Sequence, residues 1–342
     1  MAAVRPSVFV SRRLPLAIEE RMATLFDVHL NSSDSQLGAD ELIDSLAGCD
    51  VFVSSITDRI DAALIARLPP RVRLIAQFGN GVDNIDIEAA YAAGRTITNT
   101  PSVLTEDTAD MAIMLMLALP RRLIEGASVL PENGAWPGWS PTWMLGRRLR
   151  GKALGIVGMG RIGTAVATRA RALGLAIHYF SRNRRPPQVE ERLEAHYWDN
   201  LDEMLGEVDI VSLHTPHTRE TWHILDAARL ARMKSGAFLV NVSRSELVDE
   251  AALIREIESG RLAGAALDVV ESKQGAVDPR LLDLARQYRI ILTAHMASAT
   301  LEARLEMGET VIVNIRAFVD GHQPPHRVLP EGQATLGRMQ LG

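Results

Sequence analysis

The stretch "ALGIVGMGRIGTAVATRARALG" (residues 153–174) decides the fold, because three spaced glycines join an apolar run to an alanine-rich segment. Gly158, Gly160 and Gly163 form G-x-G-x-x-G, which is weak evidence alone but strong between a strand and a helix. The first glycine permits a tight turn, the second lets the backbone approach a pyrophosphate, and the third lets helix and strand pack closely. The alternative is a strand–helix turn that needs its glycines for packing alone.

The free N–H groups at the start of the following helix would bind the anion. We therefore predict a dinucleotide cradle made by Gly158, Gly160, Arg161, Ile162 and Gly163.

The end of the next strand, "HYFSRNRRP" (178–186), indicates which dinucleotide is bound. An NAD site has an acid there that binds the ribose 2′-OH. Here Ser181 takes that place and Arg182, Arg184 and Arg185 follow, so a guanidinium could hold a 2′-phosphate. We predict NADP as the preferred cofactor, with NAD as the second choice and with Ser181 and Arg182 in contact with it. The alternative is a solvated basic loop that binds nothing.

Outside this motif, strand-like and helix-like segments alternate, which is typical of an α/β protein with parallel sheets. Several strands are continuous apolar runs, as expected for a sheet covered on both faces. Helices are expected at 105–123, 250–260 and 301–322. Strands are expected at 7–11, 51–55, 72–78, 153–158, 176–180, 209–214, 237–243, 264–270 and 289–295.

Length, charge and cysteine content narrow the class of protein. The chain has 342 residues, which suggests two domains. Its net charge of −5 gives no reason to expect a nucleic-acid or membrane surface. Cys49 is the single cysteine, so an intrachain disulfide is excluded and no cysteine-based metal site is expected. A cytoplasmic protein fits this composition, and no apolar run is long enough for a membrane span.

At this point the chain resembles the D-isomer-specific 2-hydroxyacid dehydrogenases, especially their glyoxylate/hydroxypyruvate reductase branch. The resemblance covers about residues 50 to 330. It is carried by the glycine motif and by "FGNGVDNID" (78–86), "LHTPHTRETWHIL" (213–225), "VNVSRSELVDEAAL" (240–253) and "LTAHMASAT" (292–300).

The resemblance implies roles for single residues. Arg244 matches the arginine that binds the substrate, and His295 matches the catalytic acid/base. The backbone of Asn80 and Gly81 would grip the substrate carboxylate. Asp268 would lie near the nicotinamide, and the remaining residues that line the cofactor would be Thr108, Thr215, Pro216, Val242 and Ser298.

The same residue types suit the reduction of a 2-oxo acid. Arginine fits a carboxylate because its planar fork binds both oxygens. Histidine can protonate the carbonyl oxygen near neutral pH. Taken alone, an arginine such as Arg244 is more often a surface residue, and a histidine such as His295 is more often structural. Both, however, follow predicted strands, where α/β sheets bind ligands.

The resemblance also implies the domain organisation. Two Rossmann-like doubly wound domains are expected, with a dinucleotide-binding domain (104–297) inserted into a discontinuous, flavodoxin-like substrate domain (1–103 plus 298–342). The substrate would bind in a cleft that closes before hydride transfer. A homodimer is expected, formed in part by the helix at 105–123. Trp136, Trp139 and Trp143 would either reach a neighbouring subunit or pack their own loop.

The stretch "ALDVVESKQG" (266–275) departs from the family pattern. The family has a glutamate five residues after the aspartate, where it orients the catalytic histidine and favours its protonated form. That position here is Lys273. Glu271 could take over the role, Lys273 could face solvent and leave a slower enzyme with an acid optimum, or Lys273 could bind an extra anionic group. Ser245, where the family has glycine, is a second departure and could tighten the arginine turn.

The sequence therefore predicts an NAD(P)H-dependent reductase that converts a small 2-oxo acid, such as glyoxylate or hydroxypyruvate, to the D-2-hydroxy acid. One alternative is a dehydrogenase of another anionic substrate, such as a phosphonate, that uses Lys273. Another is a nucleotide-sensing binding protein with weak activity. The intact Arg244 and His295 argue against that second alternative.

Overall fold

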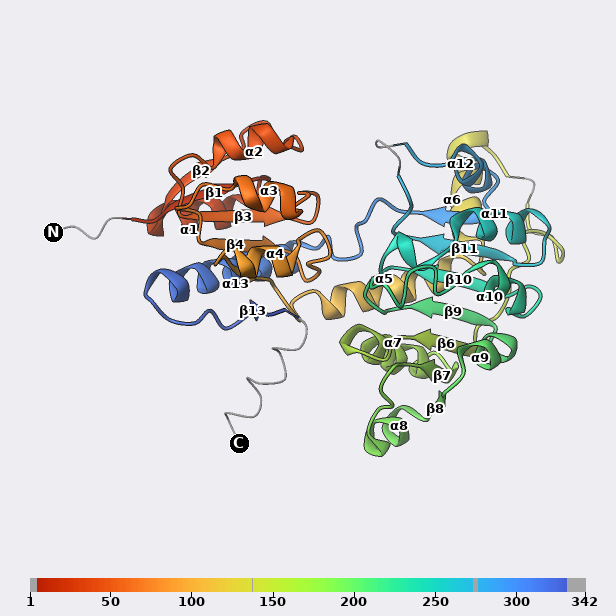
Figure 1. Cartoon of the computed structure of the whole chain (residues 1–342). Helices are drawn as coiled ribbons and strands as arrows, with labels where there is room; N and C mark the ends of the chain where they lie inside the picture. The colour runs from red at the N-terminus through yellow and green to blue at the C-terminus, as the bar shows by residue number, and fades with distance from the viewer. Residues whose placement is uncertain (1–4, 137, 273–275, 331–342) are drawn as a thin grey trace. The chain divides into compact units, whose positions relative to one another are not determined.

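The computed structural model describes residues 5–136, 138–272 and 276–330, and it divides into two compact units. One unit contains Met1–Leu104 and Ala299–Gly342, and the other is Thr105–Ser298. Each unit is an α/β layer structure built on its own sheet (Figure 1). The fold class expected from the sequence is therefore confirmed.

The discontinuous unit has a six-stranded sheet in the order β13-β5-β4-β3-β1-β2, in which β13 alone is antiparallel. Without β13 this is the flavodoxin-like order. Its elements are β1 (Ser7–Val10), α1 (Leu16–Leu25), β2 (Asp27–Leu30), α2 (Ala39–Ser45), β3 (Val51–Ser55), α3 (Ala62–Arg67), β4 (Leu74–Phe78), α4 (Ile87–Ala92), β5 (Thr96–Thr98), α13 (Leu301–Val319) and β13 (Arg327–Val328).

The continuous unit has a seven-stranded parallel sheet in the order β12-β11-β10-β9-β6-β7-β8, which extends the Rossmann order by one strand. Its elements are α5 (Thr105–Ala118), α6 (Leu123–Asn133), β6 (Ala153–Val157), α7 (Arg161–Ala172), β7 (Ala176–Phe180), α8 (Pro187–Leu193), β8 (Ala195–Trp198), α9 (Leu201–Glu207), β9 (Ile210–Leu213), α10 (Ala227–Arg232), β10 (Phe238–Asn241), the 3₁₀ turn η1 (Ser245–Leu247), α11 (Glu250–Glu258), β11 (Gly264–Leu267), α12 (Pro279–Arg286) and β12 (Ile290–Leu292).

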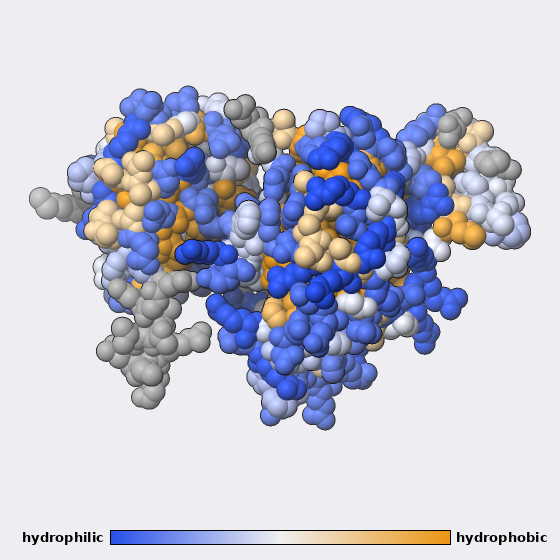
Figure 2. Space-filling model, turned by 45° about the vertical axis from the view of Figure 1, so that its right-hand side comes forward, coloured by the Kyte–Doolittle hydropathy of each residue, from blue (hydrophilic) through white to orange (hydrophobic). Residues whose placement is uncertain are grey.

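Both sheets bury both faces, which explains their apolar strands. In β10, Leu239 packs with helices α9 to α12, whereas its neighbour Val240 packs with α5 and α7 on the opposite face. Alternate residues of a strand point to opposite faces, so a doubly covered strand must be apolar along most of its length. Water meets mainly the outer sides of the helices, and the face seen in Figure 2 is largely hydrophilic with separate apolar patches.

The sequence missed four strands: β2, β5, β8 and β13. Three of these, β2, β8 and β13, lie at sheet edges, and most residues of β2 are exposed. An edge strand has one neighbour and lacks the continuous apolar run that marked the central strands. β5 has only three residues.

The single helix expected at 105–123 was also wrong. Helix α5 ends at Ala118, and α6 begins at Leu123 after a turn that contains Pro120. Arg122 in this turn has a φ of 52°, in the left-handed region. Proline cannot donate the main-chain hydrogen bond that a continuous helix needs, so the helix is interrupted there.

Candidate active site

The predicted cofactor and catalytic residues of the continuous unit gather at one edge of its sheet. Because every strand of this sheet is parallel, the segments that follow the strands lie at the same edge. The strand order reverses between β9 and β6, which is where such sheets bind ligands. Along the whole carboxyl edge, the segments after the strands carry the predicted residues: Gly158 after β6, Ser181 and Arg182 after β7, Thr215 and Pro216 after β9, Val242 and Arg244 after β10, Asp268 after β11 and His295 after β12.

The three glycines meet different surroundings. Gly158 has a φ of 97°, and a Cβ on it would lie 2.8 Å from the main chain of His214 and Thr215. A Cβ on Gly163 would lie 2.2 Å from the carbonyl oxygen of Gly158. A Cβ on Gly160 would meet no atom within 4 Å. Two glycines are thus required by the fold itself, and the third borders open space where a ligand can approach the backbone.

The N-terminus of helix α7 is suited to binding an anion. It begins at Arg161 after Gly160, and its first turn has no acidic residue. Helix α5 of the same unit, by contrast, has Glu106 and Asp107 in its first turn. The first N–H groups of a helix lack partners within the helix and attract negative charge. The residues present therefore fit a dinucleotide pyrophosphate.

The arginines after β7 are not equivalent. Arg184 makes two hydrogen bonds to Glu190, at 2.9 and 2.8 Å, and its guanidinium lies 5.2 Å from the ring centre of Tyr197. The hydrogen bonds from Arg184 and from Tyr179 lower the pKa of Glu190 to about 2. Burial, with the Glu190 contact, raises the pKa of Tyr179 to about 12. Arg184 is thus held by the protein, while Arg182 is exposed beside Ser181.

A buried asparagine shapes the turn that carries Arg244. The side chain of Asn241, 1% exposed, donates to the carbonyl oxygen of Arg244 at 2.8 Å and accepts from the Ser243 N–H at 3.0 Å. The Ser243 hydroxyl donates to the carbonyl oxygen of Thr215 at 2.6 Å. These bonds connect the segments that follow β9 and β10. Ser245 opens the 3₁₀ turn and donates to the Glu246 carboxylate at 3.0 Å.

Asp268 fixes the loop that carries His295. Its carboxylate, in a residue 1% exposed, accepts hydrogen bonds from the Thr293 hydroxyl and from the N–H groups of Met296 and Ala297, at 2.6, 2.9 and 2.9 Å. Its carbonyl oxygen accepts from the His295 N–H at 2.8 Å. The histidine itself is exposed and has a φ of 50°. Asp268 therefore positions the segment on both sides of His295.

His214 is a half-buried residue with a buried Nδ1, and it was not among the residues predicted for the site. Its Nε2 lies 2.8 Å from the Ser212 hydroxyl, and its Nδ1 has no partner among the described residues. Burial lowers the pKa of His214 to about 3, so the ring is neutral at physiological pH. The signal in the sequence was a histidine that ends the apolar run "DIVSLH" (209–214).

The other cofactor residues lie in the same unit. Thr108 is buried in α5, Val242 is 7% exposed, and Ile162 and Ser298 are half-buried. Within the described ranges, no group of three or more His, Cys, Asp and Glu side chains could hold a metal ion. None of the described helices is both long and apolar enough to cross a membrane.

Asn80 and Gly81 belong to the discontinuous unit, where they follow β4. Their carbonyl oxygens accept hydrogen bonds from the side chains of Asn99, at 2.8 Å, and Gln77, at 3.2 Å. The Gln77 amide also donates to the Asn84 side chain at 2.8 Å and accepts from the Ser54 hydroxyl at 2.7 Å. Side-chain bonds thus fix the path of this loop.

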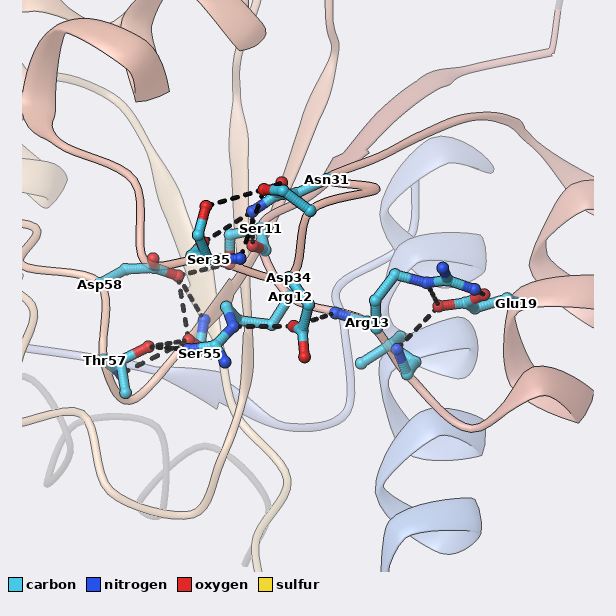
Figure 3. A network of polar contacts seen from close by, with 12 residues as sticks. Ser11, Arg12, Arg13, Glu19, Asn31, Asp34, Ser35, Ser55, Thr57 and Asp58 are labelled. Atoms are coloured by element: carbon cyan, nitrogen blue, oxygen red, sulfur yellow. Dashed lines mark hydrogen bonds and ion pairs between the residues drawn. The ribbon is translucent and has the colours of Figure 1, made fainter.

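A polar network lies beside this loop, at the carboxyl ends of β1 and β3 (Figure 3). The Asp58 carboxylate, in a residue 1% exposed, accepts from the Ser11 hydroxyl at 2.5 Å and from the Ser55 N–H at 2.7 Å. Arg12 donates to Asp34 at 2.9 Å and to the Thr57 hydroxyl at 3.3 Å. In the flavodoxin-like order these two strands flank the point of reversal, where ligands bind.

The segment after Asp268 is described as far as Ser272. The carboxylate of Glu271 lies 3.9 Å from Nε2 of His223, and its N–H donates to Glu250 at 3.0 Å. Lys273 lies outside the described residues.

The fold and this sheet edge define an α/β protein with a dinucleotide-binding domain. Residues 113–297 match the family model of the D-isomer specific 2-hydroxyacid dehydrogenase NAD-binding domain. The chain belongs to the D-isomer specific 2-hydroxyacid dehydrogenase family.

Individual relatives are similar to this chain over almost its whole length. The chain is 40% identical to a glyoxylate reductase of Thermococcus litoralis over 329 residues, which are 95% of this chain and 97% of that one. It is 41% identical to a glyoxylate reductase of Korarchaeum cryptofilum over 329 residues, 96% and 97% of the two chains. An NADPH-dependent glyoxylate/hydroxypyruvate reductase of Sinorhizobium meliloti, solved with NADP and malonate, superposes with a TM-score of 0.82 at 31% identity and covers 95% of this chain and 97% of its own.

Proposed function

We propose that this protein reduces a small 2-oxo acid, of the glyoxylate or hydroxypyruvate kind, to the D-2-hydroxy acid with NADPH. The observation that carries the proposal is the meeting of the glycine cradle, the Arg244 turn and the His295 loop at the carboxyl edge of one sheet. The names of its relatives from Thermococcus litoralis and Sinorhizobium meliloti support the same substrate class.

In this proposal Arg244 and His295 have different roles in the reaction. Arg244 binds the substrate carboxylate and holds the carbonyl carbon in place, because a guanidinium fork matches two carboxylate oxygens. His295 donates a proton to the carbonyl oxygen as negative charge develops there. The nicotinamide supplies the hydride when it is bound. Asp268 keeps the histidine loop in position through the bonds described above.

We assign the two units separate tasks. The unit Thr105–Ser298 binds the dinucleotide, with its pyrophosphate on the N–H groups at the start of α7. The discontinuous unit binds the substrate, with the main-chain N–H groups of Asn80 and Gly81 on its carboxylate. The ordered loop after β4, which Asn99 and Gln77 hold, supports this role.

NADPH is the cofactor that we propose as preferred. The segment after β7 carries no carboxylate before Glu190, and Arg184 occupies that one. The exposed Arg182 and the Ser181 hydroxyl are then suited to a 2′-phosphate. The NADP bound to the Sinorhizobium meliloti relative supports the same preference.

We also propose a homodimer formed through α5, α6 and the loop that follows them. Monomeric proteins rarely expose large apolar patches, yet this region exposes many apolar side chains. Trp136 and Trp143 pack together with ring centres 5.8 Å apart, whereas Trp139 is 80% exposed. The other exposed apolar side chains of this surface are Met114, Leu117, Leu123, Ile124, Leu130 and Leu145.

The decisive experiment is the steady-state oxidation of NADPH and NADH with glyoxylate and hydroxypyruvate. We expect turnover with NADPH, and chiral analysis of the product from hydroxypyruvate should give D-glycerate. Arg244→Gln should raise KM for the oxo acid, and His295→Gln should lower kcat by roughly two to four orders of magnitude, the usual contribution of a general acid. Tight NADPH binding without turnover of either acid would refute the proposal.

A further inference from the structure

The segment that contains His223 packs along the 3₁₀ turn that follows Arg244. The His223 N–H donates to the carbonyl oxygen of Glu246 at 2.8 Å, and the Leu225 N–H donates to that of Leu247 at 3.0 Å. Arg244 is the residue at the N-terminal end of this 3₁₀ turn. The main chain of His223 is therefore bonded directly to the turn that orients the arginine.

The side chain of His223 contacts a different loop. Its Nε2 lies 3.9 Å from the carboxylate of Glu271, in the segment that follows Asp268. The Glu271 N–H donates to the carboxylate of Glu250, the first residue of α11, at 3.0 Å. His223 thus connects the segment after β10 to the segment after β11.

Burial and backbone conformation hold this contact in place. The His223 side chain is 23% exposed, and the ring of Trp222 stacks on it with centres 3.7 Å apart and planes 11° apart. The φ of His223 is 47°, a region that histidine and asparagine enter more readily than most residues. Burial raises the pKa of Glu250, and the charges of Glu271 and Asp278 raise it further. The ring of His223 thus contacts both Trp222 and the Glu271 carboxylate.

We propose that His223 and Glu271 are positioning residues that orient Arg244 for the substrate carboxylate. This inference rests on the proposed function, in which Arg244 binds that carboxylate. The pair connects two loops of the site. Without it, the main chain of His223 stays bonded to the 3₁₀ turn but loses its side-chain anchor at Glu271, so the turn is held less firmly. The effect falls on carboxylate binding, because Glu271 acts through His223 and the Arg244 turn.

The test uses oxamate, a carboxylate analogue of small 2-oxo acids that cannot accept a hydride from NADPH. Its dissociation constant for the protein–NADPH complex is measured by NADPH fluorescence, for the wild type, His223→Asn, Glu271→Gln and the double variant. Asparagine keeps the backbone conformation at position 223 and removes the ring. Glu258→Gln, at the exposed end of α11, is the matched control.

Each single variant should bind oxamate about two- to fivefold more weakly, the order expected for the loss of one partly exposed side-chain contact. The double variant should lose no more than the weaker-binding single variant, because both substitutions break one contact. Affinity for NADPH alone should stay unchanged in all variants and in the control. In turnover with glyoxylate, KM should rise by the same factor while kcat and its pH profile stay constant.

Other results overturn the inference. The inference is wrong if both single variants bind oxamate as tightly as the wild type. It is also wrong if the losses of oxamate affinity in the two single variants multiply in the double variant. A lower kcat with a shifted pH profile in Glu271→Gln would assign Glu271 to His295 instead. If the wild type bound NADPH but no oxamate, the proposed function itself would fail. Should His223→Asn not fold, Glu271→Gln and Glu271→Ala decide the question by themselves.

Discussion

The N–H of His295 donates to the carbonyl oxygen of Asp268 at 2.8 Å, and the carboxylate of the same aspartate accepts from Thr293, Met296 and Ala297. One buried residue thus holds the histidine loop on both sides of the ring. The φ of His295 is 50°. Such a conformation costs about 1–3 kcal/mol and persists only where its surroundings enforce it. The bonds to Asp268 supply that enforcement.

Asp268→Asn should therefore lower kcat without preventing NADPH binding. The NH₂ group of the asparagine would face N–H donors whose hydrogen bonds a carboxylate oxygen accepts in the wild type. The loop that carries His295 would therefore shift. We expect kcat to fall roughly ten- to a hundredfold, and the free energy of unfolding to fall by about 1–3 kcal/mol, the usual effect of a lost buried acceptor. Steady-state kinetics and urea unfolding measure the two effects. Asp283→Asn on the surface of α12 is the control, and an unchanged kcat in Asp268→Asn would contradict the role.

Alanine substitutions at two of the glycines should separate cofactor binding from folding. Gly160→Ala places its Cβ in open space, so the melting temperature without cofactor should change little while NADPH affinity falls at least tenfold. Gly163→Ala places its Cβ 2.2 Å from the Gly158 carbonyl oxygen, so the protein itself should be destabilised. Thermal unfolding with and without NADPH distinguishes the two. Equal loss of stability in both variants would contradict the open cradle.

The central strands were predictable because a doubly covered strand is mostly apolar, as the run "AFLV" (237–240) shows. Edge strands such as β2 lack that signal. In the site, the glycines and the arginines after β7 were visible in the sequence. The sequence did not reveal two contacts, that of Arg184 with Glu190 and that of His223 with Glu271. These pairs depend on how α8 and separate loops pack.

The two arginines after β7 should respond differently to substitution. Arg182→Gln should lower the preference for NADPH over NADH, measured as the ratio of kcat/KM values, by roughly tenfold or more, because a charge-assisted hydrogen bond contributes about 1.5–3 kcal/mol. Arg184→Gln breaks the pair with Glu190 and should alter stability with a much smaller change in that ratio. If Arg184→Gln changed the preference more than Arg182→Gln did, the assignment of the 2′-phosphate site would be wrong.

His214 should make the protein sensitive to acid. Its pKa is lowered by burial from 6.5 to about 3, so the unfolded chain binds a proton in this range that the folded chain does not. The free energy of unfolding should therefore fall as the pH drops from about 6.5 towards 3. His214→Asn should flatten this dependence in urea unfolding between pH 7 and pH 4.5. The exposed His322→Asn is the control and should leave the slope as in the wild type.

Lys273→Glu introduces the carboxylate that the resemblance to the family implies at this position. A carboxylate close to His295 favours the protonated imidazole that reduction requires, whereas an ammonium group disfavours it. We expect slow turnover of glyoxylate by the wild type with an acid optimum. In Lys273→Glu we expect a higher kcat and a fall in rate that begins at a higher pH, by roughly one unit or more. The measurement is kcat and kcat/KM with NADPH from pH 5 to 9.

Charge-neutral and charge-keeping variants separate the remaining explanations. Lys273→Gln removes the ammonium group without adding a carboxylate, so it should give a smaller gain than Lys273→Glu. Lys273→Arg keeps the charge and should behave as the wild type. If the wild type is already fast and Lys273→Glu loses activity, the lysine has a role of its own. A rise in KM without a change in kcat would then indicate that it binds an anionic group of the substrate, and such a result would direct the search to more highly charged 2-oxo acids.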